Sequence, residues 1–179
     1  MKVLVVIDMQ KDFTTGVLGN EQTAAVVAPV AEKIREFRKN PEDIIFATFD
    51  THFENYMDTQ EGKNLPVPHC IKGTDGWTLD NEVAEALGDE YTPIGKLTFG
   101  SVELPQRIKA AVNTDEIEEI QLIGVCTDIC VISNAMIAKA ALYESKITVD
   151  AAACAGVTPE SHERALEAMK MCQINVINR

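Results

Sequence analysis

The stretch Ile120-Gln121-Leu122-Ile123-Gly124-Val125-Cys126-Thr127-Asp128-Ile129-Cys130-Val131 decides how this chain folds. Its first half is an apolar run typical of a buried strand, and the Ala-rich segment that follows predicts a helix over 129–143. A turn between a parallel strand and a helix is where open α/β sheets place their ligands. Cys130 falls near the first turn of that helix, where the helix dipole favours an anion and gives the thiol a reason to ionise. Cys130 is therefore a candidate nucleophile.

The rest of the chain alternates apolar strands with helices. Continuous apolar strands of this kind are typical of parallel sheets that helices cover on both faces. The sequence therefore predicts an α/β fold, a three-layer α/β/α sandwich around a six-stranded, mostly parallel sheet. No linker, repeat or low-complexity tract appears, so 1–179 is expected to form a single domain. The expected strands are 3–7, 44–49, 91–96, 120–125, 146–149 and 174–177, and the expected helices are 22–38, 80–87, 104–112, 129–143 and 159–171.

Two segments depart from this regular pattern. Pro29 lies inside the first expected helix and implies either a kink or a later start of that helix. The segment 53–78 is expected to be a long irregular loop, and loops of this length in compact domains are usually functional.

Composition limits the partners and the cellular compartment. The formal net charge is -12, which argues against nucleic acid and against anionic membranes as partners. The five cysteines are odd in number and scattered, which favours a reduced, cytoplasmic protein over a disulfide framework or a Cys-rich zinc site. The apolar run 3–7 ends at Asp8 and is too short for a signal peptide, and no stretch approaches the length of a membrane span.

Three chemically complementary residues follow or end predicted strands. Asp8, Lys96 and Cys130 are expected at one edge of the sheet, because the carboxyl ends of parallel strands lie together. Cys130 would be the nucleophile, Lys96 the cation that lowers its pKa, and Asp8 the proton carrier. Backbone N–H groups at Cys126 and Cys130 would hold the oxyanion. Each residue also has an ordinary structural explanation: a buried thiol, a capping carboxylate and a solvated ammonium.

A second group of polar residues predicts a metal site. Asp50 and His52 are two residues apart at a strand end, His69 lies across the long loop, and Glu61 lies between them. Two imidazoles with one or two carboxylates suit a divalent metal, with zinc as first choice and iron or manganese as alternatives. The alternative is that both histidines make ordinary loop hydrogen bonds. The third histidine, His162, is expected on the surface of the last helix.

The chain resembles the isochorismatase-like cysteine hydrolases, and among them most closely the nicotinamidases. The resemblance covers essentially the whole chain, with the motifs in family order. The matching stretches are Val6-Ile7-Asp8-Met9-Gln10-Lys11-Asp12-Phe13, Asp50-Thr51-His52, Pro68-His69-Cys70-Ile71-Lys72-Gly73-Thr74, Lys96-Leu97-Thr98-Phe99 and Gly124-Val125-Cys126-Thr127-Asp128-Ile129-Cys130-Val131.

The resemblance implies roles for these positions. It implies a triad of Asp8, Lys96 and Cys130, and a metal held by Asp50, His52 and His69 with Glu61 as a possible fourth ligand. It also implies a cis peptide bond between Val125 and Cys126 that turns the Cys126 amide toward the oxyanion. Phe13 and Phe99 would wall the substrate pocket. A homodimer or homotetramer is the expected assembly.

Two departures from the nicotinamidase pattern bear on the substrate. Leu65-Pro66-Val67 stands where nicotinamidases commonly carry an aromatic residue, so Leu65 would line the pocket without stacking on a ring. Cys126 stands where a small alanine is usual. The expected function is therefore hydrolysis of a small carboxamide to the acid and ammonia through a Cys130 thioester.

Several alternatives stay open. The same fold could hydrolyse another small amide or a ureido compound, or the chain could be a non-catalytic domain that binds a small molecule or a metal. Isochorismatase activity is disfavoured because that branch lacks the nucleophilic cysteine. Phosphoryl transfer on Asp8 is disfavoured because position 10, where a second carboxylate would be needed, is Gln10.

Overall fold

A computed structural model describes all 179 residues of the chain. Six strands form one sheet in the order β3-β2-β1-β4-β5-β6, and every neighbouring pair is parallel. This arrangement confirms the predicted six-stranded parallel sheet. The strands are β1 (Lys2–Ile7), β2 (Ile44–Asp50), β3 (Thr92–Lys96), β4 (Glu119–Val125), β5 (Ile147–Ala155) and β6 (Asn175–Ile177).

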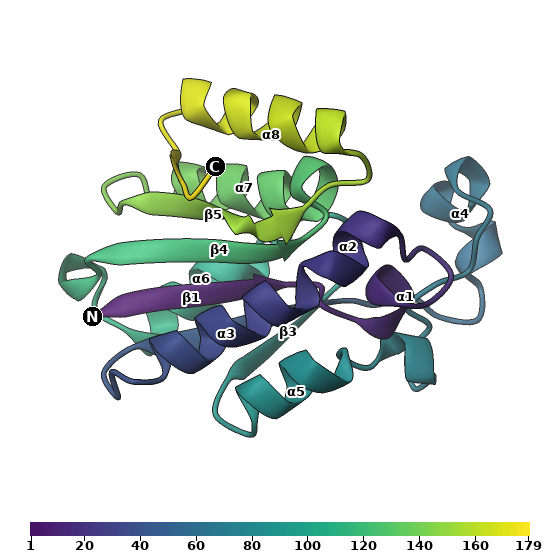
Figure 1. Ribbon diagram of the computed structural model, residues 1–179, viewed down its shortest axis with the longest axis horizontal. Helices are drawn as coiled ribbons and strands as arrows, with labels where there is room; N and C mark the ends of the chain where they lie inside the picture. Colours follow the sequence, from purple (N-terminus) through teal and green to yellow (C-terminus); the bar gives the residue numbers. More distant parts are fainter.

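Helices cover both faces of the sheet, as the sequence predicted. Helices α3 and α5 lie on one face, while α6, α7 and α8 pack on the other (Figure 1). The main helices are α2 (Glu21–Ala25), α3 (Val27–Phe37), α5 (Asn81–Leu87), α6 (Glu103–Ala111), α7 (Ile132–Ala141) and α8 (Pro159–Met171). Shorter segments are α1 (Lys11–Thr14), α4 (Gln60–Asn64), a π-helical turn (Thr127–Val131) and 3-10 turns at Tyr56–Asp58, Asp75–Trp77 and Thr114–Glu116.

The central strand shows why an unbroken apolar run forms this layer. In β1, Val3, Val5 and Ile7 pack into the core beneath α6 and α7, while Leu4 and Val6 pack beneath α3 and α5. All five side chains are completely buried. Alternate residues of a strand point to opposite faces, so a strand between two helical layers must be apolar at every position.

The strand order reverses between β1 and β4, which is where open parallel sheets bind ligands. Gly124 lies at this reversal, opposite Ile7, with a φ of 116° that side-chain-bearing residues rarely adopt. A Cβ at this position would collide with the Ile7 backbone carbonyl oxygen. The close approach of the two strands therefore depends on glycine.

Some element boundaries differ from the predictions. The helix expected over 22–38 divides at Val26 into α2 and α3, and Pro29 lies in the first turn of α3, so the later start is correct. The strand expected to end at residue 149 continues to Ala155, because it pairs with β4 again at Cys154 and Ala155 after a register shift. Asp150 inside this strand is buried, with Lys33 as an ion-pair partner 3.0 Å away. The long segment 53–78 contains α4 and two 3-10 turns rather than irregular structure alone.

Two further features agree with the sequence. All five cysteines are free, so no disulfide framework is present. None of the helices has both the length and the hydrophobicity that crossing a bilayer requires.

Candidate active site

Asp8, Lys96 and Cys130 meet at the carboxyl edge of the sheet. Asp8 directly follows β1 in a left-handed backbone conformation with a φ of 48°, Lys96 ends β3, and Cys130 lies in the π-helical turn after β4. The Lys96 Nζ lies 2.7 Å from Asp8 Oδ2 and 3.6 Å from Cys130 Sγ. At most 5% of the surface of any of the three residues is exposed. The structure thus brings together the three residues that the strand-end argument selected.

The surroundings of Asp8 favour proton uptake. Thr48 Oγ1 donates a hydrogen bond of 2.7 Å to Asp8 Oδ1, which fixes the carboxylate plane. The other oxygen, Oδ2, is buried and accepts no hydrogen bond apart from its ion pair with Lys96. Burial raises the pKa of Asp8 and the neighbouring Lys96 ammonium opposes that rise, with a net upward shift. Asp8 is thus a stronger base than an exposed aspartate, and it has a free lone pair.

The thiol of Cys130 differs from the sequence-based expectation of a resting thiolate. Burial raises the pKa of Cys130 well above its usual range, and the Asp8 carboxylate raises it further. Lys96 acts in the opposite direction without cancelling these two effects. The resting cluster is therefore a neutral thiol beside an ion pair, and the thiol proton must leave when Cys130 attacks.

Lys96 is held in the charged state by its carboxylate neighbours. Burial alone would lower the pKa of Lys96, but Asp8 and Asp50 outweigh it, and the net shift is upward. Lys96 Nζ lies 3.2 Å from Asp50 Oδ1, in addition to its contact with Asp8. A permanent cation is thus positioned between two carboxylates and one thiol.

The turn that carries Cys130 has an unusual backbone. The Val125–Cys126 peptide bond is cis, as the family resemblance implied. The Cys126 carbonyl oxygen then accepts hydrogen bonds from the N–H groups of Ile129 at 3.1 Å and Val131 at 3.0 Å, which closes the turn. Cys126 itself has a pKa raised to about 12 by burial, so its side chain stays a neutral thiol.

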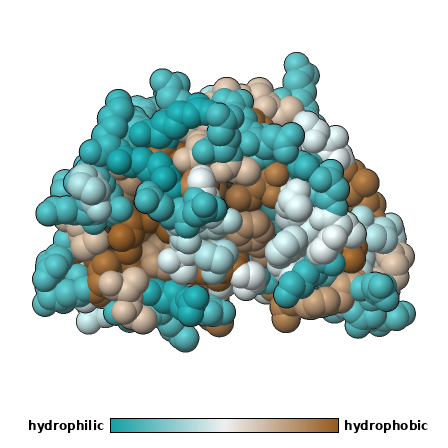
Figure 2. Space-filling model, turned by 90° about the horizontal axis from the view of Figure 1, so that it is seen from below, coloured by the Kyte–Doolittle hydropathy of each residue, from teal (hydrophilic) through white to brown (hydrophobic).

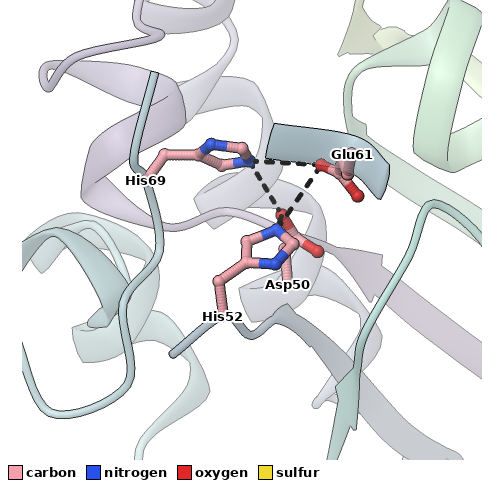
Figure 3. Close-up of side chains that lie close together, drawn as sticks. All are labelled: Asp50, His52, Glu61 and His69. Carbon is pink, nitrogen blue, oxygen red and sulfur yellow. Dashed lines mark hydrogen bonds and ion pairs between the residues drawn. The ribbon is translucent and has the colours of Figure 1, made fainter. Parts of the chain in front are cut away.

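A second cluster lies beside the first, on the side of Asp50 away from Lys96. Figure 3 shows the side chains of Asp50, His52, Glu61 and His69 pointing toward one another. Asp50 Oδ2 lies 3.1 Å from His52 Nε2 and 3.3 Å from His69 Nε2, and Glu61 Oε1 lies 3.5 Å and 3.7 Å from the same nitrogens. One donor atom from each of the four residues lies within 4.8 Å of the others.

The chemistry of this donor set fits a divalent metal. The Val67 carbonyl oxygen lies 2.8 Å from His69 Nδ1, so Nδ1 carries the proton and the lone pair of Nε2 faces the cluster. Burial would raise the pKa of Asp50, but its contacts with His52 and His69 and the charge of Lys96 lower it, so Asp50 is ionised. Two imidazole nitrogens and two carboxylates match zinc, and they also suit iron or manganese.

The whole chain matches one protein family. The family model described as the isochorismatase domain matches residues 2–179. The chain belongs to the isochorismatase family. Relatives matched over nearly the whole chain include nicotinamidases, which hydrolyse an amide C–N bond, and the chain is an enzyme of the hydrolase class.

Individual members of the family are similar over their full length. The nicotinamidase/pyrazinamidase of Mycobacterium tuberculosis is 24% identical over 190 residues, covering 99% of this chain and 98% of the relative. The structure of the pyrazinamidase/nicotinamidase from Streptococcus mutans has a TM-score of 0.85 at 26% identity, covering 99% and 100% of the two chains. The pyrazinamidase of Pyrococcus horikoshii, solved in complex with zinc, has a TM-score of 0.81 at 26% identity, covering 99% of each chain.

Phe13, Leu65 and Phe99 are the residues expected to line the substrate pocket. Phe13 is half-buried, with its ring centroid 5.6 Å from that of His69. Leu65 is partly exposed, and its carbonyl oxygen accepts a 2.9 Å hydrogen bond from the Tyr56 hydroxyl. Phe99 is 45% exposed, in the loop after β3. Phe13 thus contacts a residue of the second cluster, and the contact of all three residues with substrate stays a prediction.

The sequence analysis gave no role to several residues that hold the site in place, although some of them lie inside the quoted motifs. Gln10 is fully buried, and its side chain holds the backbone of Asp50 through two hydrogen bonds. Gln10 Oε1 accepts from the Asp50 N–H at 2.8 Å, and Gln10 Nε2 donates to the Asp50 carbonyl oxygen at 2.9 Å. Asp12 Oδ2 accepts a 2.7 Å hydrogen bond from the Cys70 N–H and thereby holds the His69 segment. A buried polar residue in an apolar motif is the signal that could have marked Gln10.

Two other supporting residues touch the turn that carries Cys130. Asn134 is fully buried, and its Nδ2 donates to the carbonyl oxygens of Cys130 at 2.8 Å and Phe99 at 3.1 Å. His162 corrects the sequence-based expectation of a surface residue. It is half-buried, and its Nδ1 lies 2.8 Å from the Thr127 hydroxyl, because α8 packs against the turn.

Proposed function

We propose that this enzyme hydrolyses a small carboxamide to the carboxylic acid and ammonia through a thioester on Cys130. The observation that carries the proposal is the buried contact of Asp8, Lys96 and Cys130, with Lys96 Nζ within 3.6 Å of the thiol sulfur. A nucleophile, a base with a raised pKa and a fixed cation in a water-poor site form the minimum set for acyl transfer.

The first half of the reaction forms the thioester. Asp8 takes the proton of the Cys130 thiol as the sulfur attacks the carboxamide carbon, and the carbonyl π electrons move to oxygen. Backbone N–H groups at Cys126 and Cys130 would receive this oxyanion. Lys96 stabilises the charge that develops at the sulfur and keeps Asp8 correctly placed. When the intermediate collapses, Asp8 gives its proton to the nitrogen and ammonia leaves.

The second half regenerates the thiol. Asp8, again a carboxylate, accepts a proton from a water molecule that attacks the thioester carbon. Collapse of the second tetrahedral intermediate breaks the C–S bond, and Asp8 returns its proton to the sulfur. The carboxylic acid is released, and the resting ion pair of Asp8 with Lys96 is restored.

The second cluster would hold a divalent metal through Asp50, His52, His69 and Glu61, with zinc as the first candidate. A metal bound there supplies Lewis acidity and a coordination position for a heteroatom of the substrate or for water. Independently of a metal, the ion pair between Asp50 and Lys96 fixes the two clusters relative to each other.

Nicotinamide is the first candidate substrate, because relatives named nicotinamidase match this chain over nearly its whole length. Another small amide or a ureido compound is the second candidate. It is favoured by the aliphatic segment Leu65-Pro66-Val67, which offers no aromatic face for a pyridine ring.

A panel of small amides and ureido compounds, nicotinamide included, separates these candidates by ammonia release with and without a chelator. Release from nicotinamide supports the first candidate. Release only from another compound keeps the mechanism and changes the substrate. No Cys130-dependent release from any compound would contradict the proposed function.

A further inference from the structure

The turn that carries Cys130 is held from behind by helix α8. Thr127 stands inside this turn, directly after Cys126, and is completely buried. Its hydroxyl oxygen lies 2.8 Å from Nδ1 of His162, in the first turns of α8. The neighbouring residue, Asp128, accepts a hydrogen bond from the Val157 N–H at 3.2 Å. Two adjacent residues of the turn are thus tied to the segment that begins α8.

The buried hydroxyl of Thr127 needs a hydrogen-bond partner, and His162 provides it. A buried hydroxyl costs free energy unless it has a hydrogen-bond partner, and the His162 imidazole is the side-chain partner of this one. The backbone of His162 also lies close to Gly156, the residue that follows β5. A Cβ at Gly156 would lie 2.9 Å from the His162 nitrogen. The position of α8 is therefore transmitted to Thr127 through the hydrogen bond with His162.

We propose that His162, acting through Thr127, is a positioning residue that holds the Cys126–Cys130 turn in the geometry needed to receive the oxyanion. This inference rests on the proposed acyl-transfer function. Cys126 and Cys130 are the two residues whose N–H groups would meet the oxyanion, and Thr127 lies between them in sequence. A small displacement of Thr127 moves both, and oxyanion stabilisation depends steeply on donor position.

The link depends on the protonation state of the imidazole. A neutral His162 can accept the Thr127 O–H at Nδ1, whereas an imidazolium has only donors and forces the hydroxyl to turn. Burial lowers the pKa of His162, Arg179 lowers it further, and Glu163 and Asp128 act in the opposite direction. The neutral, accepting form therefore persists at neutral pH, and acid converts it into the donor form.

Free imidazole from solution can take the place of the His162 side chain. It lines a groove of about 310 Å³ whose other walls include the small residues Ala25, Pro29, Ala152 and Pro159. Truncation of the side chain in the His162→Ala variant would open this groove toward the Thr127 hydroxyl. Free imidazole is small enough to enter a space of this size and to offer the missing nitrogen.

The experiment compares His162→Ala, His162→Asn, Thr127→Val and the double variant His162→Ala/Thr127→Val, with Arg164→Ala as a matched control on an exposed position of the same helix. We expect His162→Ala to lower kcat by about 10–100-fold with KM changed by less than about threefold, since the lost interaction acts on the transition state. His162→Asn keeps a hydrogen-bonding group near the position of Nδ1 and should retain more activity than His162→Ala.

Three further readouts separate positioning from a general packing effect. Added imidazole should restore kcat in His162→Ala and not in Thr127→Val. The double variant should be no worse than Thr127→Val, because both changes remove the same contact. The loss of kcat in acid that depends on His162 should be absent in His162→Asn, because an amide does not titrate. Wild-type kcat in a folded His162→Ala, or additive losses without rescue by imidazole, would overturn the proposal.

Alkylation of Cys130 by iodoacetamide tests the same inference without turnover. Loosening of the turn should raise the alkylation rate of Cys130 in His162→Ala several-fold over Arg164→Ala, and imidazole should reverse the increase. Equal rates in the two variants would overturn the positioning role. If no amide is hydrolysed by the wild type, the proposed function fails, while this measurement still decides the role of His162.

Discussion

Lys96 Nζ lies 3.2 Å from Asp50 Oδ1, and this one contact joins the thiol cluster to the cluster of metal-ligand candidates. The other oxygen of the same carboxylate lies 3.1 Å from His52 Nε2 and 3.3 Å from His69 Nε2. Asp50 is thus shared between two groups of residues with different chemistry. A change at Asp50 should therefore have two separable effects.

The Asp50→Asn variant tests this shared role. The amide keeps the size of the side chain but removes the charge that faces both histidines and Lys96. We expect zinc to bind at least about 100-fold more weakly, and ammonia release to fall as well. Zinc binding is measured by calorimetry on metal-free protein. Asp75→Asn, which removes an exposed carboxylate paired with Lys11, is the control and should bind zinc like the wild type. Unchanged zinc affinity in Asp50→Asn would exclude Asp50 as a ligand.

The Cys130→Ala variant tests the nucleophile. Removal of the sulfur should reduce ammonia release by a factor on the order of 10³ or more, because no thioester can form. The change removes a single buried atom, so the variant should fold, as checked by circular dichroism and by thermal unfolding. Cys172→Ala, at an exposed cysteine, should keep wild-type activity. Turnover in Cys130→Ala equal to that of the wild type would exclude the thioester route.

The pH dependence of kcat/KM reports on Asp8. Burial raises the pKa of Asp8, and the proposed reaction needs its carboxylate form. Activity should therefore be lost as the pH falls through the raised value, so the acid limb should lie above the range of about 4 that an exposed aspartate gives. The loss reflects protonation of the Asp8–Cys130 pair as a unit. Asp8→Asn should be inactive at every pH. An acid limb at or below about pH 4 in the wild type would contradict this account.

The Asn134→Ala variant tests the hydrogen bonds that hold the backbone of Cys130. Asn134 donates to the carbonyl oxygens of Cys130 and Phe99 and accepts the Ser101 N–H at 3.0 Å, so its loss leaves two buried polar groups and one partly buried polar group without a partner. We expect the free energy of unfolding to fall by about 2–4 kcal/mol, measured by urea denaturation. The exposed Asn64→Ala change should cost less than about 0.5 kcal/mol. Equal stability of the two variants would show that the Asn134 contacts contribute little.

Much of the architecture followed from pattern alone. The apolar runs at β1, β2 and β4 predicted a buried parallel sheet, and their carboxyl ends predicted where Asp8 and Cys130 would meet. Strand ends are informative because parallel strands share one edge, so convergence needs no knowledge of the loops. The same argument failed for β5, because a buried aspartate at position 150 interrupts the apolar run, and its partners Lys33 and Asn178 are distant in the sequence.

The supporting residues could not be predicted in this way. Gln10, Asn134 and His162 act through hydrogen bonds to residues that are 4 to 67 positions away in the chain. Such contacts depend on how helices and loops pack, and periodicity does not encode them. The protonation state of Cys130 was likewise inaccessible, since it depends on the depth of burial and on the balance of Asp8 against Lys96.

The tight contact between Gly124 and Ile7 has a practical consequence for altering the substrate range. Mutant libraries aimed at the loop after β4 would normally randomise every position from 124 to 131. Position 124 would accept glycine alone, because any side chain collides with the neighbouring strand and the backbone is left-handed there. Leu65 and Phe99, whose side chains are partly exposed, are better positions to randomise.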